Sequence, residues 1–477
     1  MRKTKIICTL GPASSDEKTI AEMVKAGMNV ARLNFSHGTH EYHKEIIERI
    51  KKVRNELKAP LAIMLDTKGP EIRVKQFRNG SETLETGAKF VLTTKDVEGT
   101  KDKVSITYPD LPGQLTEGQK ILIDDGNITL CVDSCTDTDI NCTVLFGGVI
   151  KNNKGINVPN VRMDMKYLSE KDEADLVFGV ENDVDFVAAS FVRRKEDVVS
   201  LRRFIDYHGG HNIKIISKIE NIEGVENFDE ILEQSDGIMI ARGDMGVEIE
   251  YERLPGIQKK AIRKIYRAGK MAITATQMME SMIHNNHPTR AEISDVANAV
   301  FDGTSAIMLS GETAAGDHPV TVVKAMAKIA RQAEKDAFEM DAYRGLKCDN
   351  DIADITNAIC DAACTTARDV DASAIIAVTK SGYTARRVSK FRPVENIVAA
   401  TPSEKTFNQL ALSWGVYPVL AKNQTDEEKL FRHAVDCAMF TGLLNEGDRV
   451  VITAGMPLNV EGTTNLLKVE TIGKAAK

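Results

Sequence analysis

The chain has 477 residues, enough for roughly three domains of ordinary size. Its 42% hydrophobic and 27% charged residues are typical of a globular protein, and its formal net charge of −7 excludes nucleic-acid binding through bulk positive charge. The eight cysteines form no C-x-x-C pair, which fits a reducing compartment, so we expect a cytoplasmic protein. Because no apolar run approaches about 18 residues, we expect no membrane partner.

Short apolar strands alternate with amphipathic helices along most of the chain. Strands that are buried on both faces and separated by helices build a parallel sheet, and eight such units close into a (β/α)₈ barrel. A doubly wound open sheet is the alternative, but no G-x-G-x-x-G turn follows the first strand. The eight candidate strands are residues 5–10, 29–35, 61–67, 185–191, 213–219, 237–243, 271–277 and 306–312.

Helix signals fall between these strands. Ser15, followed by two acidic residues, predicts the start of the first helix. Apolar residues recur on one face within 46–57, and Thr289 with Glu292 forms a capping box ahead of a later helix.

The units are unevenly spaced, which indicates further domains. A long stretch rich in Thr, Asp and Gly separates the third and fourth strands, with strand-like alternation near residues 128–133. We predict a β-rich domain at residues 70–164, inserted into a barrel of residues 1–69 and 165–338. Because it leaves from the C-terminal face, where barrel active sites lie, it can act as a lid. A C-terminal α/β regulatory domain is expected at residues 346–477.

Charged side chains gather at the predicted C-terminal ends of the barrel strands. Lys218 and Glu220 share one face at the end of the fifth strand, and Asp244 follows the sixth. One interpretation is an ion-pair network that merely closes the barrel. The functional one is that Glu220 and Asp244 hold Mg²⁺ while Lys218 and Arg32 meet a phosphate.

Two further groups of residues extend this site. Thr276 lies on the seventh strand, and Gly243 directly precedes Asp244. Oxygen-bearing side chains follow the second and third strands and suit another, weaker cation; they are Asn34, Ser36, Asp66 and Thr67. The spacing alone therefore predicts a Mg²⁺-dependent phosphoryl-transfer enzyme on a barrel.

Long motifs at these positions resemble the pyruvate kinase family, from the first strand to the GTTN segment near the C-terminus. The motifs are RLNFSHG (32–38), MLDTKGPEIR (64–73), IISKIENIEGV (215–225), ARGDMGVE (241–248), TATQMMESM (274–282) and HPTRAEISDVANAVFDGTSAIMLSGETA (287–314). The resemblance implies transfer of phosphate from phosphoenolpyruvate to ADP, giving pyruvate and ATP. It also implies Mg²⁺ (or Mn²⁺) and K⁺ as cofactors and a homotetramer. We expect the bacterial type, without the extra C-terminal domain of some members.

The resemblance assigns roles residue by residue. Lys218 would stabilise the phosphoryl group in transit, and Glu220 and Asp244 would bind Mg²⁺. Phosphoenolpyruvate would be held by Arg32, Thr276 and the backbone at Gly243 and Asp244, with Thr276 also near the path by which the enolate is protonated.

The remaining assignments concern K⁺ and the nucleotide. The K⁺ ligands would be Asn34, Ser36, Asp66 and Thr67. The nucleotide contacts would be Asn34, His37, Arg73 and Lys154, with Lys151 as a competitor for Lys154. Glu71 matches a position that is acidic in K⁺-dependent members, so we predict K⁺ dependence.

A strand-to-helix turn in the C-terminal domain offers a second site. Its backbone N–H groups and hydroxyls can cradle a phosphate, although a plain capped turn is the alternative. By resemblance, a phosphorylated metabolite would bind there as an allosteric effector, with AMP left open; the residues are Thr379, Lys380, Ser381, Gly382 and Thr384.

For the whole chain, a catalytically silent phosphometabolite sensor is the alternative function. A barrel enzyme that passes phosphate from phosphoenolpyruvate to another acceptor is a third.

Overall fold

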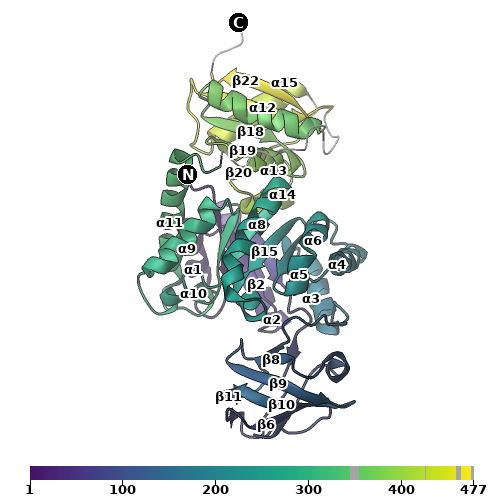
Figure 1. The fold of residues 1–477 in the computed structure, drawn as a ribbon. Helices are drawn as coiled ribbons and strands as arrows, with labels where there is room; N and C mark the ends of the chain where they lie inside the picture. Colours follow the sequence, from purple (N-terminus) through teal and green to yellow (C-terminus); the bar gives the residue numbers. More distant parts are fainter. Residues whose placement is uncertain (344–353, 425, 458–462, 474–477) are drawn as a thin grey trace.

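The computed structural model describes residues 1–343, 354–424, 426–457 and 463–473. Three bodies lie in a row, with the barrel between a smaller β domain and a C-terminal α/β domain (Figure 1). The predicted start of the last domain, residue 346, lies outside the described residues. Within the described ranges, none of the helices combines the length and apolar character that crossing a membrane requires.

The predicted barrel is confirmed: all eight strands pair in parallel and close on themselves in the order β1-β17-β16-β15-β14-β13-β3-β2. Side chains fill its interior, among them Ile7, Met64 and Phe186, which are fully buried. Leu412 of the C-terminal domain belongs to the same buried cluster. The strands are β1 (Lys5–Thr9), β2 (Val30–Asn34), β3 (Ala62–Asp66), β13 (Phe186–Ala189), β14 (Lys214–Ile219), β15 (Gly237–Ala241), β16 (Met271–Ala275) and β17 (Ala306–Leu309).

Helices surround the barrel and pack their apolar faces on its strands. The Thr289–Glu292 capping box is confirmed, but the first helix is capped by Asp16 rather than Ser15, since the Asp16 carboxylate accepts from the backbone of Thr19. The helices are α1 (Glu17–Ala26), α2 (His40–Leu57), α3 (Glu170–Glu181), α4 (Lys195–Tyr207), α5 (Ile222–Glu226), α6 (Phe228–Gln234), α7 (Arg242–Glu248), α8 (Leu254–Arg267), α9 (Arg290–Phe301), α10 (Gly311–Ala314) and α11 (Pro319–Glu339).

The inserted domain follows β3 and builds its own hydrophobic core. Its larger sheet has the order β4-β12-β8-β9-β10-β6-β7, and β11 pairs with β5. Alternation along β9 buries Ile128, Leu130 and Val132, as the sequence pattern predicts. The strands are β4 (Ile72–Arg73), β5 (Ser81–Leu84), β6 (Lys89–Thr93), β7 (Lys103–Ser105), β8 (Lys120–Ile123), β9 (Ile128–Cys135), β10 (Asp139–Phe146), β11 (Gly148–Lys151) and β12 (Gly155–Asn157).

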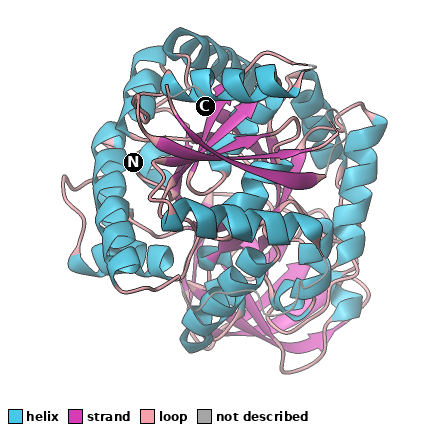
Figure 2. Cartoon of the chain, turned by 90° about the horizontal axis from the view of Figure 1, so that it is seen from above, coloured by secondary structure: helices cyan, strands magenta, loops and turns pink. Residues whose placement is uncertain are grey.

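The C-terminal domain is a five-stranded sheet of order β20-β19-β18-β21-β22, with helices on both faces (Figure 2). Four of its strands pair in parallel, and an antiparallel fifth strand, β22, adds to the edge. Its elements are α12 (Ile355–Asp369), β18 (Ala374–Val378), α13 (Tyr383–Lys390), β19 (Asn396–Thr401), α14 (Glu404–Gln409), β20 (Val416–Leu420), α15 (Glu427–Met439), β21 (Arg449–Gly455) and β22 (Thr464–Thr471).

This domain covers the end of the barrel where the strands begin. Gly415 N donates to Lys3 O just ahead of β1, and Lys405 Nζ lies 2.7 Å from Asp183 Oδ1 ahead of β13. The carboxyl ends of the strands therefore face the inserted domain at the other end (Figure 1).

Candidate active site

Lys218 lies at the centre of a buried polar cluster at the carboxyl end of the barrel. Its ammonium donates to Ser190 Oγ at 2.7 Å and to Asp66 Oδ1 at 3.0 Å, and it forms an ion pair with Glu220 Oε1 at 3.1 Å. Burial acts to lower the pKa of Lys218, but the carboxylates of Asp66 and Glu220 outweigh burial and raise that pKa. Lys218 therefore carries its charge at neutral pH.

A second cation lies beside it. Arg32 Nε is 2.6 Å from Asp66 Oδ2, and its Nη1 donates to Thr9 Oγ1 at 2.8 Å. Burial acts to raise the pKa of Asp66, but Arg32 and Lys218 outweigh it and hold that pKa below its usual value. The Asp66 carboxylate thus bridges two cations and fixes their separation.

Glu220 and Asp244 form the acidic side of this site. Glu220 is 1% exposed and accepts from the backbone N–H of Phe191 at 2.6 Å. Burial raises the pKa of Glu220, and the charge of Asp244 raises it further. A buried carboxylate with a second carboxylate nearby favours a cation between the two, and their hard oxygens suit Mg²⁺.

The donor set fits a cation that keeps open positions. Among the described residues no group of three or more His, Cys, Asp or Glu is placed to hold a metal ion. The other ligands would be substrate oxygens and water, which Mg²⁺ usually retains.

Thr276 and Gly243 meet across the ends of β15 and β16. Thr276 Oγ1 accepts from Gly243 N at 2.7 Å and donates to Ala275 O at 2.6 Å. Thr276 has a φ of 69°, a conformation that is costly for a β-branched residue. Arg242 Nη2 holds Thr276 in this conformation by donating to Thr276 O at 2.7 Å, and Arg242 Nη1 pairs with Asp295.

The oxygen-rich group predicted for K⁺ lies on the neighbouring strands. Asn34 pairs with Asp66 in the register of β2 and β3, and Asn34 Oδ1 accepts from Ser36 N at 3.1 Å. Thr67 Oγ1 accepts from Ser190 N at 3.1 Å. Both Asp66 oxygens already contact cationic side chains, so a K⁺ ion here would share that carboxylate with Arg32 and Lys218.

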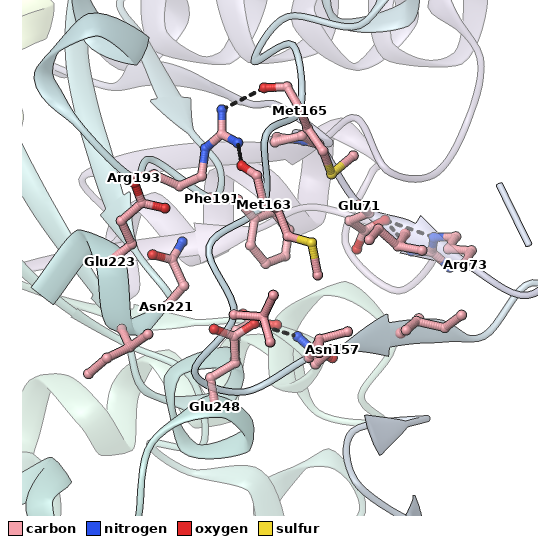
Figure 3. A pocket seen from close by; sticks show the side chains of 18 of the residues that line it. Glu71, Arg73, Asn157, Met163, Met165, Phe191, Arg193, Asn221, Glu223 and Glu248 are labelled. Carbon is pink, nitrogen blue, oxygen red and sulfur yellow. Dashed lines mark hydrogen bonds and ion pairs between the residues drawn. The ribbon is translucent and has the colours of Figure 1, made fainter. Parts of the chain in front are cut away.

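A cavity of about 250 Å³ opens between the inserted domain and the barrel (Figure 3). Arg73 and Lys154 line it from the inserted domain, and Asp244 lines it from the barrel. Lys151, the competitor for Lys154, is exposed on β11 and is not among the lining residues. Asn34 and His37 are also not among them, and His37 is exposed on the barrel.

The two basic residues of the inserted domain are held by acidic neighbours. Arg73 Nη2 lies 2.6 Å from Glu71 Oε2, and Lys154 Nζ lies 2.6 Å from Asp124 Oδ1. Because each pair is only partly buried, an anionic ligand can compete for the cation at modest cost.

The predicted effector residues surround a separate cavity of about 100 Å³ in the C-terminal domain. Thr379, Lys380, Ser381 and Thr384 line it, and Gly382 forms the turn with a φ of 79°. The sequence did not point to Lys422 and His433, which line the same cavity from segments far along the chain.

The sequence pattern also did not indicate three residues of the site that lie close to Lys218 in the fold. Ser190 and Phe191 follow β13, and Arg193 lies two residues further on. Their position at the end of a barrel strand was the available signal, but an uncharged Ser-Phe pair carries no chemical pattern of its own.

Comparisons with known proteins agree on one family. The family model described as "Pyruvate kinase, barrel domain" matches residues 1–323, and "Pyruvate kinase, alpha/beta domain" matches residues 357–470. A pyruvate kinase of Clostridium acetobutylicum is 48% identical over 473 residues, covering 99% of this chain and all of the relative. One of Geobacillus stearothermophilus is 49% identical over 473 residues, with 99% and 80% covered. One of Staphylococcus aureus (strain MRSA252) is 48% identical over 478 residues, with 99% and 81% covered.

Proposed function

The chain belongs to the pyruvate kinase family, and we propose that the residues gathered around Lys218 carry out the family's reaction. In that reaction phosphoenolpyruvate gives its phosphoryl group to ADP, yielding pyruvate and ATP, so the protein is a glycolytic phosphotransferase. The observation that supports this site is the buried Lys218 ammonium held between Asp66 and Glu220 at the barrel mouth.

The test is a coupled assay of pyruvate formation that omits phosphoenolpyruvate, ADP, Mg²⁺ or K⁺ in turn. We expect turnover to require all four. No turnover under any combination would revive the silent phosphometabolite sensor, which nothing in this site favours. Turnover without ADP would point to a different barrel enzyme that uses phosphoenolpyruvate.

The substrate would occupy the positive side of the cluster. Phosphoryl transfer depends on positioning and on stabilising charge at the equatorial oxygens. Lys218 and Arg32 bring two positive charges to the phosphoryl group. The backbone N–H groups at Gly243 and Asp244 and the hydroxyl of Thr276 would hold the rest of phosphoenolpyruvate, with Thr276 near the enolate carbon.

Two cations complete the proposed site. Glu220 and Asp244 would hold Mg²⁺ or Mn²⁺, which when bound supplies positive charge to the phosphoryl oxygens. The proposed K⁺ ligands are Asn34, Ser36, Asp66 and Thr67.

The nucleotide would enter the cavity between the inserted domain and the barrel. Arg73 and Lys154 would contact its phosphates from the wall of this cavity. Asn34 and His37, which lie outside the cavity, are proposed as further nucleotide contacts by resemblance alone. The pairing of Arg73 with Glu71 reduces the positive charge available to those phosphates, and K⁺ would offset this.

The C-terminal cavity would bind a phosphorylated metabolite that regulates the enzyme. Lys380, with hydroxyls from Thr379, Ser381 and Thr384, supplies the donors that a phosphate requires. The half-saturation concentration of phosphoenolpyruvate should change with fructose 1,6-bisphosphate, glucose 6-phosphate or AMP, and no response to any of them would contradict the proposal. By resemblance we also propose a cytoplasmic homotetramer, which light scattering can test for assembly.

A further inference from the structure

One short turn lies between the cluster around Lys218 and the segment that leads from the inserted domain back to the barrel. It runs from Ser190 to Arg193, directly after β13 at the carboxyl end of the barrel. None of its residues is charged except Arg193, which is 6% exposed.

The first half of the turn holds the reacting groups. Ser190 Oγ accepts from Lys218 Nζ at 2.7 Å and donates to Thr67 O at 2.6 Å. Phe191 N donates to Glu220 Oε2 at 2.6 Å. Phe191 has a φ of 53°, which is costly for an aromatic residue and directs this N–H towards the carboxylate. The turn therefore orients both Lys218 and Glu220.

The second half holds the inserted domain. Arg193 Nη1 donates to Met163 O and Arg193 Nη2 to Met165 O, both at 2.9 Å, as Figure 3 shows. These methionines lie between β12 and α3, on the segment that returns the chain from the inserted domain to the barrel. The Asp197 carboxylate accepts from Arg193 Nε and Nη2, both at 3.2 Å, so the guanidinium is held by this carboxylate as well as by the two backbone carbonyls.

We propose that Arg193 is a positioning residue for phosphoryl transfer, because it fixes the return segment at Met163 and Met165 to the turn that orients Lys218 and Glu220. This inference rests on the proposed roles of Lys218 and Glu220. If the return segment were displaced, Arg193 would move with it, and Ser190, only three positions earlier in the same turn, would move as well. A misplacement of about 1 Å at a reacting group can cost about 100-fold in rate.

A double-mutant cycle separates this role from a purely structural one. Ser190→Ala removes the inner contact, Arg193→Met removes the outer one, and the third variant carries both. We expect each single change to lower kcat/KM by about 10- to 100-fold. The kcat/KM of the double variant should be no more than about threefold lower than that of the less active single variant, because both changes break the same connection.

The chain offers a matched control. Arg162 joins the same return segment to the barrel through an exposed ion pair with Glu226 at 3.1 Å. Arg162→Met should keep kcat/KM within about twofold of the wild type, since an exposed pair contributes little. Its effect should add to that of Ser190→Ala.

Two further variants distinguish a loss of catalytic positioning from a loss of stability. Arg193→Met/Asp197→Asn leaves no buried carboxylate unpaired and should show the same kinetic loss with a smaller change in Tm. Arg193→Lys keeps the charge and one donor direction, and should recover part of the activity. Additive effects of Ser190→Ala and Arg193→Met, or wild-type kcat/KM in Arg193→Met/Asp197→Asn, would overturn the inference. An inactive wild type would instead overturn the proposed function.

Discussion

Replacing Lys218 with Met removes one positive charge while keeping the apolar stem in the barrel. A unit charge about 4 Å from a phosphoryl oxygen contributes about 4 kcal/mol at the effective dielectric constant of about 20 that suits protein sites. Since each factor of ten in rate corresponds to about 1.4 kcal/mol, Lys218→Met should lower kcat by about 1000-fold. The coupled pyruvate assay measures this directly.

Lys214→Met is the matched control, because Lys214 begins the same strand at the opposite end of the barrel and pairs with Asp236. It should turn over like the wild type. A Lys218→Met enzyme within tenfold of wild-type kcat would refute the electrostatic argument. Lys218→Met should also lower the free energy of unfolding, because Glu220 loses the cation that lies 3.1 Å away.

Three further predictions concern the cavity between the domains. Lys154→Met should raise the KM for ADP at least tenfold while Lys151→Met leaves it unchanged, and equal effects would remove Lys154 from the nucleotide site. Activity in Tris buffer should fall when K⁺ is omitted, and less so in Glu71→Lys, whose ammonium supplies the missing charge; an unchanged wild-type rate would contradict this. Burial raises the pKa of Glu248 from 4.5 to about 7, so the folded state holds this proton more tightly than the unfolded chain and stability falls as pH rises through that range. In EDTA, Glu248→Gln should therefore raise Tm at pH 8 and raise it much less at pH 5. An equal gain in Tm at both pH values would contradict the raised pKa of Glu248.

The barrel was predictable because its signal is local. Each strand is a short apolar run between helices, and eight of them leave few closed arrangements. Strand β22 was not predicted, because its mixed polar and apolar side chains at residues 464–471, nearly all of them half-buried or exposed, form no continuous apolar run and only pairing with β21 defines the strand.

The site was predictable only where charge marks it. Lys218 and Glu220 stand out because charged residues are rare at the end of a buried strand. Ser190 carries no such mark, and its contacts with Lys218 and Thr67 join residues 28 and 123 positions apart. The sequence gives no distance between those positions, so the partner of a small polar residue emerges only from the fold.

The C-terminal domain also completes the barrel from below. Ala411 and Leu412 are almost fully buried in the same cluster as Ile7 and Phe186 of the barrel interior. A chain ending after α11 would leave the floor of the barrel open to water and lose these contacts. The barrel and the C-terminal domain should therefore melt in a single cooperative transition.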